Sequence, residues 1–159
     1  MTGTAFPVWT KPLRVYPAGP PRAVRVAFVA LVVALVAGVA ETIARAFLSP
    51  AADPASVATG LGLRMAIYLL VLAVAVRMTR GDRWARLFLT VGIGVFGLLP
   101  LLIEPLAAAM SANELRDLVR DAAPALLLLA AFRAVHVIAV LIAIPALYTR
   151  PARRYFHER

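Results

Sequence analysis

Six ionisable side chains stand inside long apolar stretches of this sequence, and they are the side chains best placed to do chemistry. They are Glu41, Arg45, Arg64, Glu104, Arg133 and His136. Carboxylates and guanidiniums form strong, often two-pronged hydrogen bonds, and a histidine donates or accepts hydrogen bonds or ligates a metal. Because an ionisable side chain within hydrocarbon is costly, such a side chain is a functional hypothesis by default.

Four apolar stretches carry these side chains, at residues 26–48, 56–76, 84–106 and 124–148. Each has about the 20 residues that a helix needs to cross a bilayer. None shows the alternation of period two that is typical of membrane barrel strands. The composition agrees, since 62% of the chain is hydrophobic and only 16% is charged. The sequence therefore predicts an all-α polytopic membrane protein, a bundle of four transmembrane helices.

Depth along each helix follows from a rise of about 1.5 Å per residue. By this count one charge from each stretch lies roughly 9–13 Å below the outer end of its helix. These four charges, two of each sign, are Glu41, Arg64, Glu104 and Arg133. We expect them to meet inside the bundle as carboxylate–guanidinium pairs. Arg45 shares a helical face with Glu41, and His136 shares one with Arg133.

Three interpretations of this polar layer stay open at the sequence level. In the first, neutralised pairs fix the register of the helices, because interhelical polar contacts in membranes contribute only about 0.6–2 kcal/mol. In the second, two guanidiniums and His136 form a pocket for a lipid phosphate or another anion, and the glutamates relay protons. In the third, the charges pair with a partner subunit.

Cofactor and metal binding are not expected. A haem held by His136 would need a second axial ligand. His157 lies in the tail, and Met65 is a conceivable but unfavoured second ligand. The chain has no cysteine and no spacing typical of a zinc site.

The distribution of basic residues predicts the orientation. Residues 1–25, 77–86 and 149–159 each hold four of the 17 basic residues, whereas the opposite loops hold three. Short loops rich in arginine and lysine stay in the cytoplasm, so both termini are expected there. The net charge of +9 is then mostly a topology signal and does not indicate a nucleic-acid partner. The chain divides into a proline-rich cytoplasmic arm (1–25), a transmembrane domain (26–148) and a basic cytoplasmic tail (149–159).

A cleaved signal peptide is the alternative interpretation of the first stretch, with Gly38-Val39-Ala40 as the small-residue site. The basic region before it is long and proline-rich, and the apolar pattern resumes after Ala40, so a retained helix is favoured. Inside the third stretch, Pro100 predicts a kink.

A short basic and aromatic segment follows the second stretch. Its side chains Arg80, Arg83, Trp84 and Arg86 are expected to contact the inner leaflet. Arginines there would bind lipid phosphates, and the tryptophan would anchor the interface.

This segment, read as Arg80-Gly81-Asp82-Arg83-Trp84-Ala85-Arg86, resembles a recurring feature of small four-helix actinobacterial membrane proteins, a group without an assigned activity. The ending Ile144-Pro145-Ala146-Leu147 before Pro151-Ala152-Arg153-Arg154 is similar to theirs as well. The resemblance implies a multi-pass plasma (inner) membrane protein and supplies no activity. Small multidrug transporters also have four helices with a glutamate in the first, but the fixed charge bias and the Arg133–His136 pair depart from them.

The function expected from these observations is that of a non-catalytic integral plasma-membrane protein, an accessory or assembly partner. Its partners would be membrane lipids together with another membrane protein or further copies of itself. The alternative is binding or transport of an anionic lipid or small solute. An enzyme is not expected, because a hydrolase wants a nucleophile with a base in reach. The serines considered, Ser49, Ser56 and Ser111, lie in predicted loops without such a partner.

Overall fold

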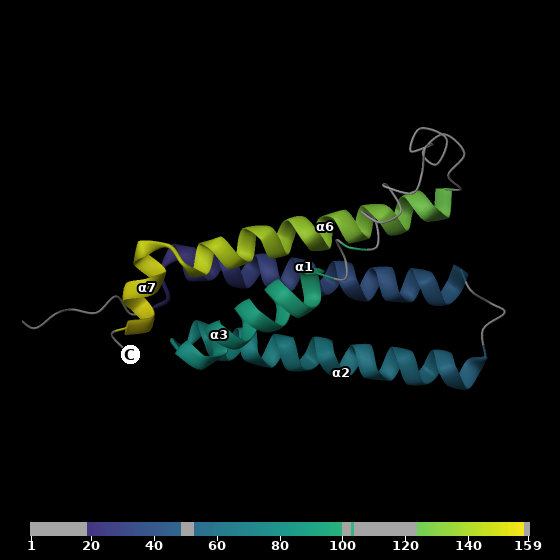
Figure 1. Ribbon diagram of the computed structural model, residues 1–159, viewed down its shortest axis with the longest axis horizontal. Helices are drawn as coiled ribbons and strands as arrows, with labels where there is room; N and C mark the ends of the chain where they lie inside the picture. The colour runs from purple at the N-terminus through teal and green to yellow at the C-terminus, as the bar shows by residue number, and fades with distance from the viewer. Residues whose placement is uncertain (1–18, 49–52, 100–102, 104–123, 158–159) are drawn as a thin grey trace, which may run out of the picture.

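The protein is seen in a computed structural model that describes residues 19–48, 53–99, 103 and 124–157 (Figure 1). The expected arm up to residue 18 and Glu104 lie outside these ranges. Every element in the described ranges is a helix, and none is a strand, which confirms the all-α prediction. In chain order they are α1 (Arg22–Leu48), α2 (Pro54–Thr79), α3 (Arg83–Val91), the π-helix η1 (Gly92–Gly97), α6 (Pro124–Leu147) and α7 (Arg150–His157).

Three helices are long and apolar enough to cross a membrane: Arg22–Leu48, Ala55–Thr79 and Pro124–Leu147. Their 27, 25 and 24 residues exceed the number needed to span hydrocarbon about 30 Å thick. The fourth expected span, at 84–106, is described as helix through α3 and η1 and then only to Leu99, with residue 103 beyond. A fourth span and the side on which the termini lie therefore stay predictions.

Helices α1 and α6 run antiparallel and pack along each other, while α2 lies on another side of α1 (Figure 1). Small residues form the α1–α6 contact. Ala27, Ala30 and Ala34 of α1 and Ala139 and Ala143 of α6 are all buried. Helices within lipid gain no hydrophobic driving force from association, so close packing has to hold them together. Small side chains permit this because they let the helices approach closely.

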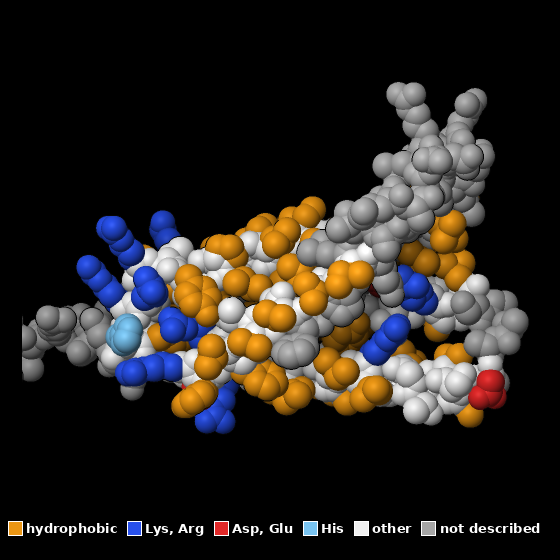
Figure 2. Space-filling view, viewed as in Figure 1, with side chains coloured by type: hydrophobic (Ala, Val, Ile, Leu, Met, Phe, Trp, Pro, Cys, Tyr) orange, Lys and Arg blue, Asp and Glu red, His pale blue; other side chains and the backbone are white. Residues whose placement is uncertain are grey.

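The largest core cluster lies at one end of the bundle, where α7 folds across it. Leu31, Met78, Leu89, Leu147 and Phe156 are almost fully buried there. The basic side chains gather at this same end (Figure 2). We call it the basic end, and the other end, where α1 leads into α2, the loop end.

The tail expected at 149–159 is thus an ordered helix over most of its length. Arg83 donates from Nε to the carbonyl of Phe156 (2.7 Å) and from Nη2 to that of His157 (3.1 Å), which caps the end of α7. Tyr155 donates its hydroxyl to the carbonyl of Thr79 (2.7 Å). These two contacts fasten α7 to the turn between α2 and α3.

That turn follows from three residues. Gly81 has φ of 92°, a left-handed conformation that other residues rarely adopt. Asp82 then caps α3 by accepting from the backbone N–H groups of Trp84 (2.8 Å) and Ala85 (3.3 Å). Arg77, in the last turn of α2, pairs with the same carboxylate. Hence α2 and α3 are joined by a tight, charge-stabilised corner.

The helix that begins at α3 widens into η1, which ends three residues before Pro100 in the sequence. The N–H of Leu98 bonds to the carbonyl of Ile93, five residues earlier. A proline inside a helix cannot donate to the carbonyl four residues before it and clashes with that group, and π-type turns are one way to accommodate the disruption. Pro100 itself lies outside the described residues, so the predicted kink there is untested; the irregularity that the structure shows lies in the preceding turn.

Candidate functional site

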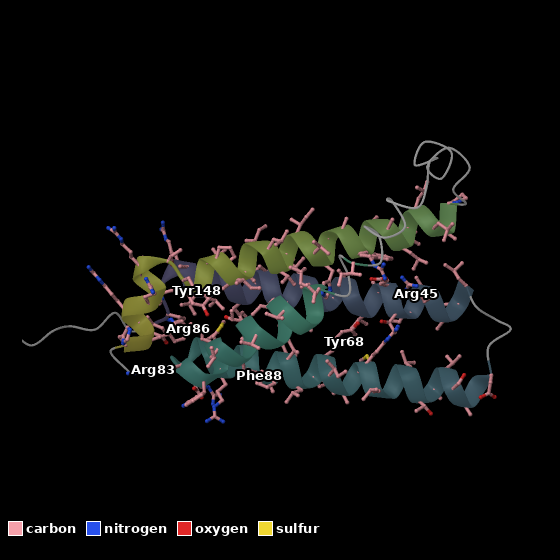
Figure 3. All side chains as sticks on the ribbon, viewed as in Figure 1. Arg45, Tyr68, Arg83, Arg86, Phe88 and Tyr148 are labelled. Atoms are coloured by element: carbon pink, nitrogen blue, oxygen red, sulfur yellow. The ribbon has the colours of Figure 1, made fainter. Side chains whose placement is uncertain are left out.

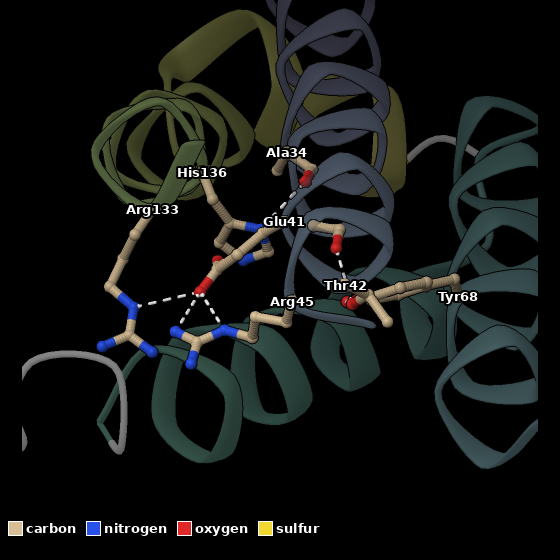
Figure 4. Close-up of polar contacts among 8 residues, drawn as sticks. Ala34, Glu41, Thr42, Arg45, Tyr68, Arg133 and His136 are labelled. Carbon is tan, nitrogen blue, oxygen red and sulfur yellow. Dashed lines mark hydrogen bonds and ion pairs between the residues drawn. The ribbon is translucent and has the colours of Figure 1, made fainter. Parts of the chain in front are cut away.

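Glu41 is the centre of a polar site between α1 and α6 (Figure 4). Only 8% of the residue is exposed. Arg45, one turn later on α1, donates to Glu41 Oε1 from Nε (3.1 Å) and from Nη2 (2.7 Å). Arg133 of α6 brings its Nε to 3.4 Å from the same oxygen. One carboxylate oxygen therefore joins two guanidiniums from two helices, and the structure brings Glu41, Arg45 and Arg133 together as the sequence predicts.

His136, one turn along α6 from Arg133, reaches back to the backbone of α1. Its Nδ1 lies 2.8 Å from the carbonyl oxygen of Ala34. A carbonyl only accepts, so Nδ1 carries the proton and donates. In a neutral imidazole the other nitrogen, Nε2, is then left as an acceptor. His136 thus binds α6 to α1 a short distance from the charge cluster.

Two further polar side chains, Thr42 and Tyr68, complete the site and were not anticipated from the sequence. Thr42 donates its hydroxyl to the carbonyl of Gly38 (2.8 Å), so the contact of 3.3 Å between Thr42 Oγ1 and the Tyr68 hydroxyl has Tyr68 as donor. Tyr68 extends from α2 toward α1 (Figure 3). Tyr68 is the single tyrosine in the second apolar stretch, and this is the sequence feature from which its role could have been predicted.

Gly38 is where α2 and α6 both come close to α1. A Cβ at this position would lie 3.0 Å from the Tyr68 hydroxyl oxygen and 3.3 Å from His136 Nδ1. Only glycine leaves room for both side chains without a shift. The space that Gly38 leaves on α1 is therefore filled by polar groups from the two neighbouring helices.

Arg64 does not join this site. It is exposed on α2, and among the described residues no ion pair or hydrogen bond involves its side chain. The most apolar part of α2 has no buried residue at all. The expected layer with one charge from each helix is therefore not assembled as predicted in the described part of the chain. Counting residues along a helix gives the position of a side chain along the helix axis. It does not give the distance between side chains on different helices.

The residues expected at the inner leaflet divide into two pairs. Arg83 and Arg86 face α7 (Figure 3): Arg83 caps it, and the Arg86 guanidinium lies 5.2 Å from the ring centre of Tyr148 and 5.0 Å from that of Phe156. Arg86 Nε is buried and, within the described ranges, has no hydrogen-bond partner, so the two rings supply its stabilisation. Arg80 and Trp84 are exposed. Contact with lipid stays a prediction for all four.

Among the described residues, the polar site brings two guanidiniums, those of Arg45 and Arg133, to a single carboxylate. Such a site can hold an anion or anchor an acidic partner. Within the described residues no group of three His, Cys, Asp or Glu side chains could hold a metal ion.

The chain matches no family model, no curated protein sequence and no solved structure. Its function must therefore be inferred from the geometry of the site itself.

Proposed function

We propose that this chain is a non-catalytic integral plasma-membrane protein that acts as an accessory or assembly partner, with four spans and both termini in the cytoplasm. The gathering of basic side chains at one end supports this orientation (Figure 2), because positively charged loops stay on the cytoplasmic side. A broad apolar surface along the helices supports the membrane location.

The observation that carries the assembly role is the exposed Arg64 on α2. It lies ten residues into the helix, about 15 Å along the axis, and hence well inside a hydrocarbon layer about 30 Å thick. A guanidinium at this depth requires an acidic or polar partner. Glu41 already binds two guanidiniums of its own. We infer that a carboxylate from a second membrane protein, or from another copy of this chain, meets Arg64.

The surface around Arg64 suits such a partner. Leu63, Ile67 and Leu70 of α2 are 64%, 48% and 53% exposed. In a membrane, contact between these apolar side chains and lipid costs little free energy. This face of the helix is therefore available for packing against another helix. A charged side chain within an apolar helix face specifies which partner and which register are accepted.

Site-specific photo-crosslinking tests the assembly role. A photoreactive side chain at Leu63, beside Arg64, should capture a second polypeptide in native membranes, and Arg64→Leu should abolish the product. The matched control is Leu141 of α6, which is similarly exposed at 52%. The role would be refuted if the side chain at Leu63 crosslinked only to lipid or only within its own molecule. Capture of a second polypeptide from Leu141 as often as from Leu63 would refute it as well.

A second candidate, binding or transport of a small anion, is favoured by the two guanidiniums that meet at the polar site, with His136 one turn away on α6. The probe is uptake of labelled inorganic phosphate by vesicles that contain the full-length protein. If the site handles anions, uptake exceeds that of empty vesicles and is lost when Glu41→Leu and Arg133→Leu are combined. Uptake that persists in the double variant excludes this candidate.

A further inference from the structure

A groove runs along the outside of α1 and α6 at the basic end, away from the polar site. Its volume is about 590 Å³. Two small buried residues, Ala30 of α1 and Ala139 of α6, lie at its floor. Its walls are branched and half-exposed side chains from both helices, namely Val26, Val29, Val33, Val135, Ile138 and Ile142. The small residues between these larger ones thus form the floor of an apolar groove on the outer surface of the two helices.

Two arginines, Arg22 and Arg25, close one end of this groove. Both are exposed, and among the described residues no carboxylate pairs with either. The side chains that line the groove in the described part of the chain include no acidic one. The groove therefore has positive charge at one end and hydrocarbon along the rest.

The length of the groove matches one leaflet of a bilayer. From Arg22 to Val33 the helix advances eleven residues, about 17 Å. Half of a hydrocarbon layer about 30 Å thick is about 15 Å. A lipid whose headgroup lies at the two arginines would therefore extend its acyl chain along the groove to about the middle of the membrane.

We propose that this groove binds an anionic phospholipid, with its phosphate at Arg22 and Arg25 and one acyl chain along the alanine floor. Guanidiniums bind phosphate oxygens through paired, charge-assisted hydrogen bonds. Basic pockets between membrane helices are suited to anionic headgroups. The site is separate from Arg64 and from the Glu41 cluster, so it does not depend on the assembly role.

Native mass spectrometry of the full-length protein tests the site. The delipidated protein is mixed in mild detergent with phosphatidylglycerol or with phosphatidylcholine. We expect one phosphatidylglycerol to be retained per chain and phosphatidylcholine to be retained far less. Combining Arg22→Gln and Arg25→Gln should lower retention of phosphatidylglycerol by about tenfold or more, since each lost charge-assisted bond is worth roughly one order of magnitude in affinity.

Two matched controls separate a built site from general attraction. Arg150→Gln with Arg153→Gln removes the same charge from the same end of the molecule, on the exposed face of α7, and should leave retention unchanged. Val29→Trp blocks the groove without changing charge and should lower retention, whereas Val36→Trp, on the same helix but outside this groove, should not.

Three results would overturn the proposal. Phosphatidylcholine retained as well as phosphatidylglycerol would show that the headgroup is not recognised. Equal loss in the Arg150 and Arg153 variant would show that only net charge matters. Unchanged retention in Val29→Trp would show that the acyl chain lies elsewhere. Circular dichroism of each variant checks that its helices are intact.

Discussion

At the scale of the residue, the space left by Gly38 and the carboxylate of Glu41 determine how the helices meet. Gly38 admits Tyr68 from α2 and His136 from α6 against the same turn of α1. Glu41 holds Arg45 and Arg133 through one oxygen. Polar contacts from three helices are thereby concentrated within two turns of α1.

Gly38→Ala should destabilise the protein by about 1–3 kcal/mol, because the added methyl group overpacks a filled site. Its Cβ would meet the Tyr68 hydroxyl at 3.0 Å. The matched control is Gly62→Ala on α2, where nothing lies within 4 Å of the added carbon. Unfolding in detergent measures both variants. Equal stability of the two would mean that the three helices do not converge at Gly38.

Glu41→Gln should weaken the bundle by about 1–3 kcal/mol, because two guanidiniums lose their anionic partner. Arg133→Leu alone should cost less, since Arg45 still neutralises Glu41. A double-mutant cycle over Glu41 and Arg133, read by the same unfolding assay, should give a coupling energy of at least about 0.5 kcal/mol. Strict additivity would show that the contact of 3.4 Å contributes nothing.

Part of this site could be predicted from the sequence, and the physical reason for the rest is clear. A charged residue in an apolar run is visible as such, so Glu41, Arg45, Arg133 and His136 were identified. Tyr68 and Thr42 are ordinary membrane residues, and only the approach of α2 to α1 gives them partners. The depth expected for Arg64 stays a prediction, and its distance from α1 depends on packing that periodicity does not encode.

At the scale of the element, α7 and the α2–α3 corner fix the basic end. Three of the four expected stretches match long apolar helices to within a few residues: 26–48 against Arg22–Leu48, 56–76 against Pro54–Thr79, and 124–148 against Pro124–Leu147. The fourth, at 84–106, is described as helix only as far as Leu99 and at residue 103. Long apolar runs carry that information directly. Helix α7 was expected only as part of a basic tail, because its buried residues, Ala152 and Phe156, are few among many charges.

Arg83→Ala should release α7 from the bundle, because it removes both hydrogen bonds to the terminal carbonyls. Hydrogen exchange of the α7 amides should rise by at least about tenfold, because the loss of even one charged hydrogen bond corresponds to roughly that factor. Arg153→Ala, an exposed arginine on α7 itself, is the control and should leave exchange unchanged. Similar hydrogen-exchange rates of the α7 amides in the two variants would contradict the capping role of Arg83.

The corner between α2 and α3 should be sensitive to acid. The hydrogen bond from Arg77 holds the pKa of Asp82 below its ordinary value of 3.8, although desolvation opposes the shift. The ionised carboxylate therefore contributes fully above pH 3.8, and its contribution is lost as the pH falls through the lowered pKa. Carboxyl NMR of Asp82 should show a pKa that rises toward 3.8 in Arg77→Gln. An identical pKa in both proteins would contradict the pairing.

At the scale of the whole molecule, the described helices form an open bundle that is tight at the basic end and along α1–α6. Helix α2 has no buried residue in its most apolar part, and its Arg64 is exposed. An isolated soluble fold would bury such a helix, whereas a membrane subunit leaves it for lipid and for a partner. The assembly role proposed above rests on this unequal burial.

The mass of the particle extracted from native membranes in polymer discs tests that role most directly. One chain contributes 17.0 kDa. We predict that the protein mass of the wild-type particle exceeds the mass of one chain by that of a defined partner or of a second copy. In Arg64→Leu the protein mass should fall to that of one chain. A wild-type particle that holds a single chain and lipid, indistinguishable from Arg64→Leu, would contradict the account.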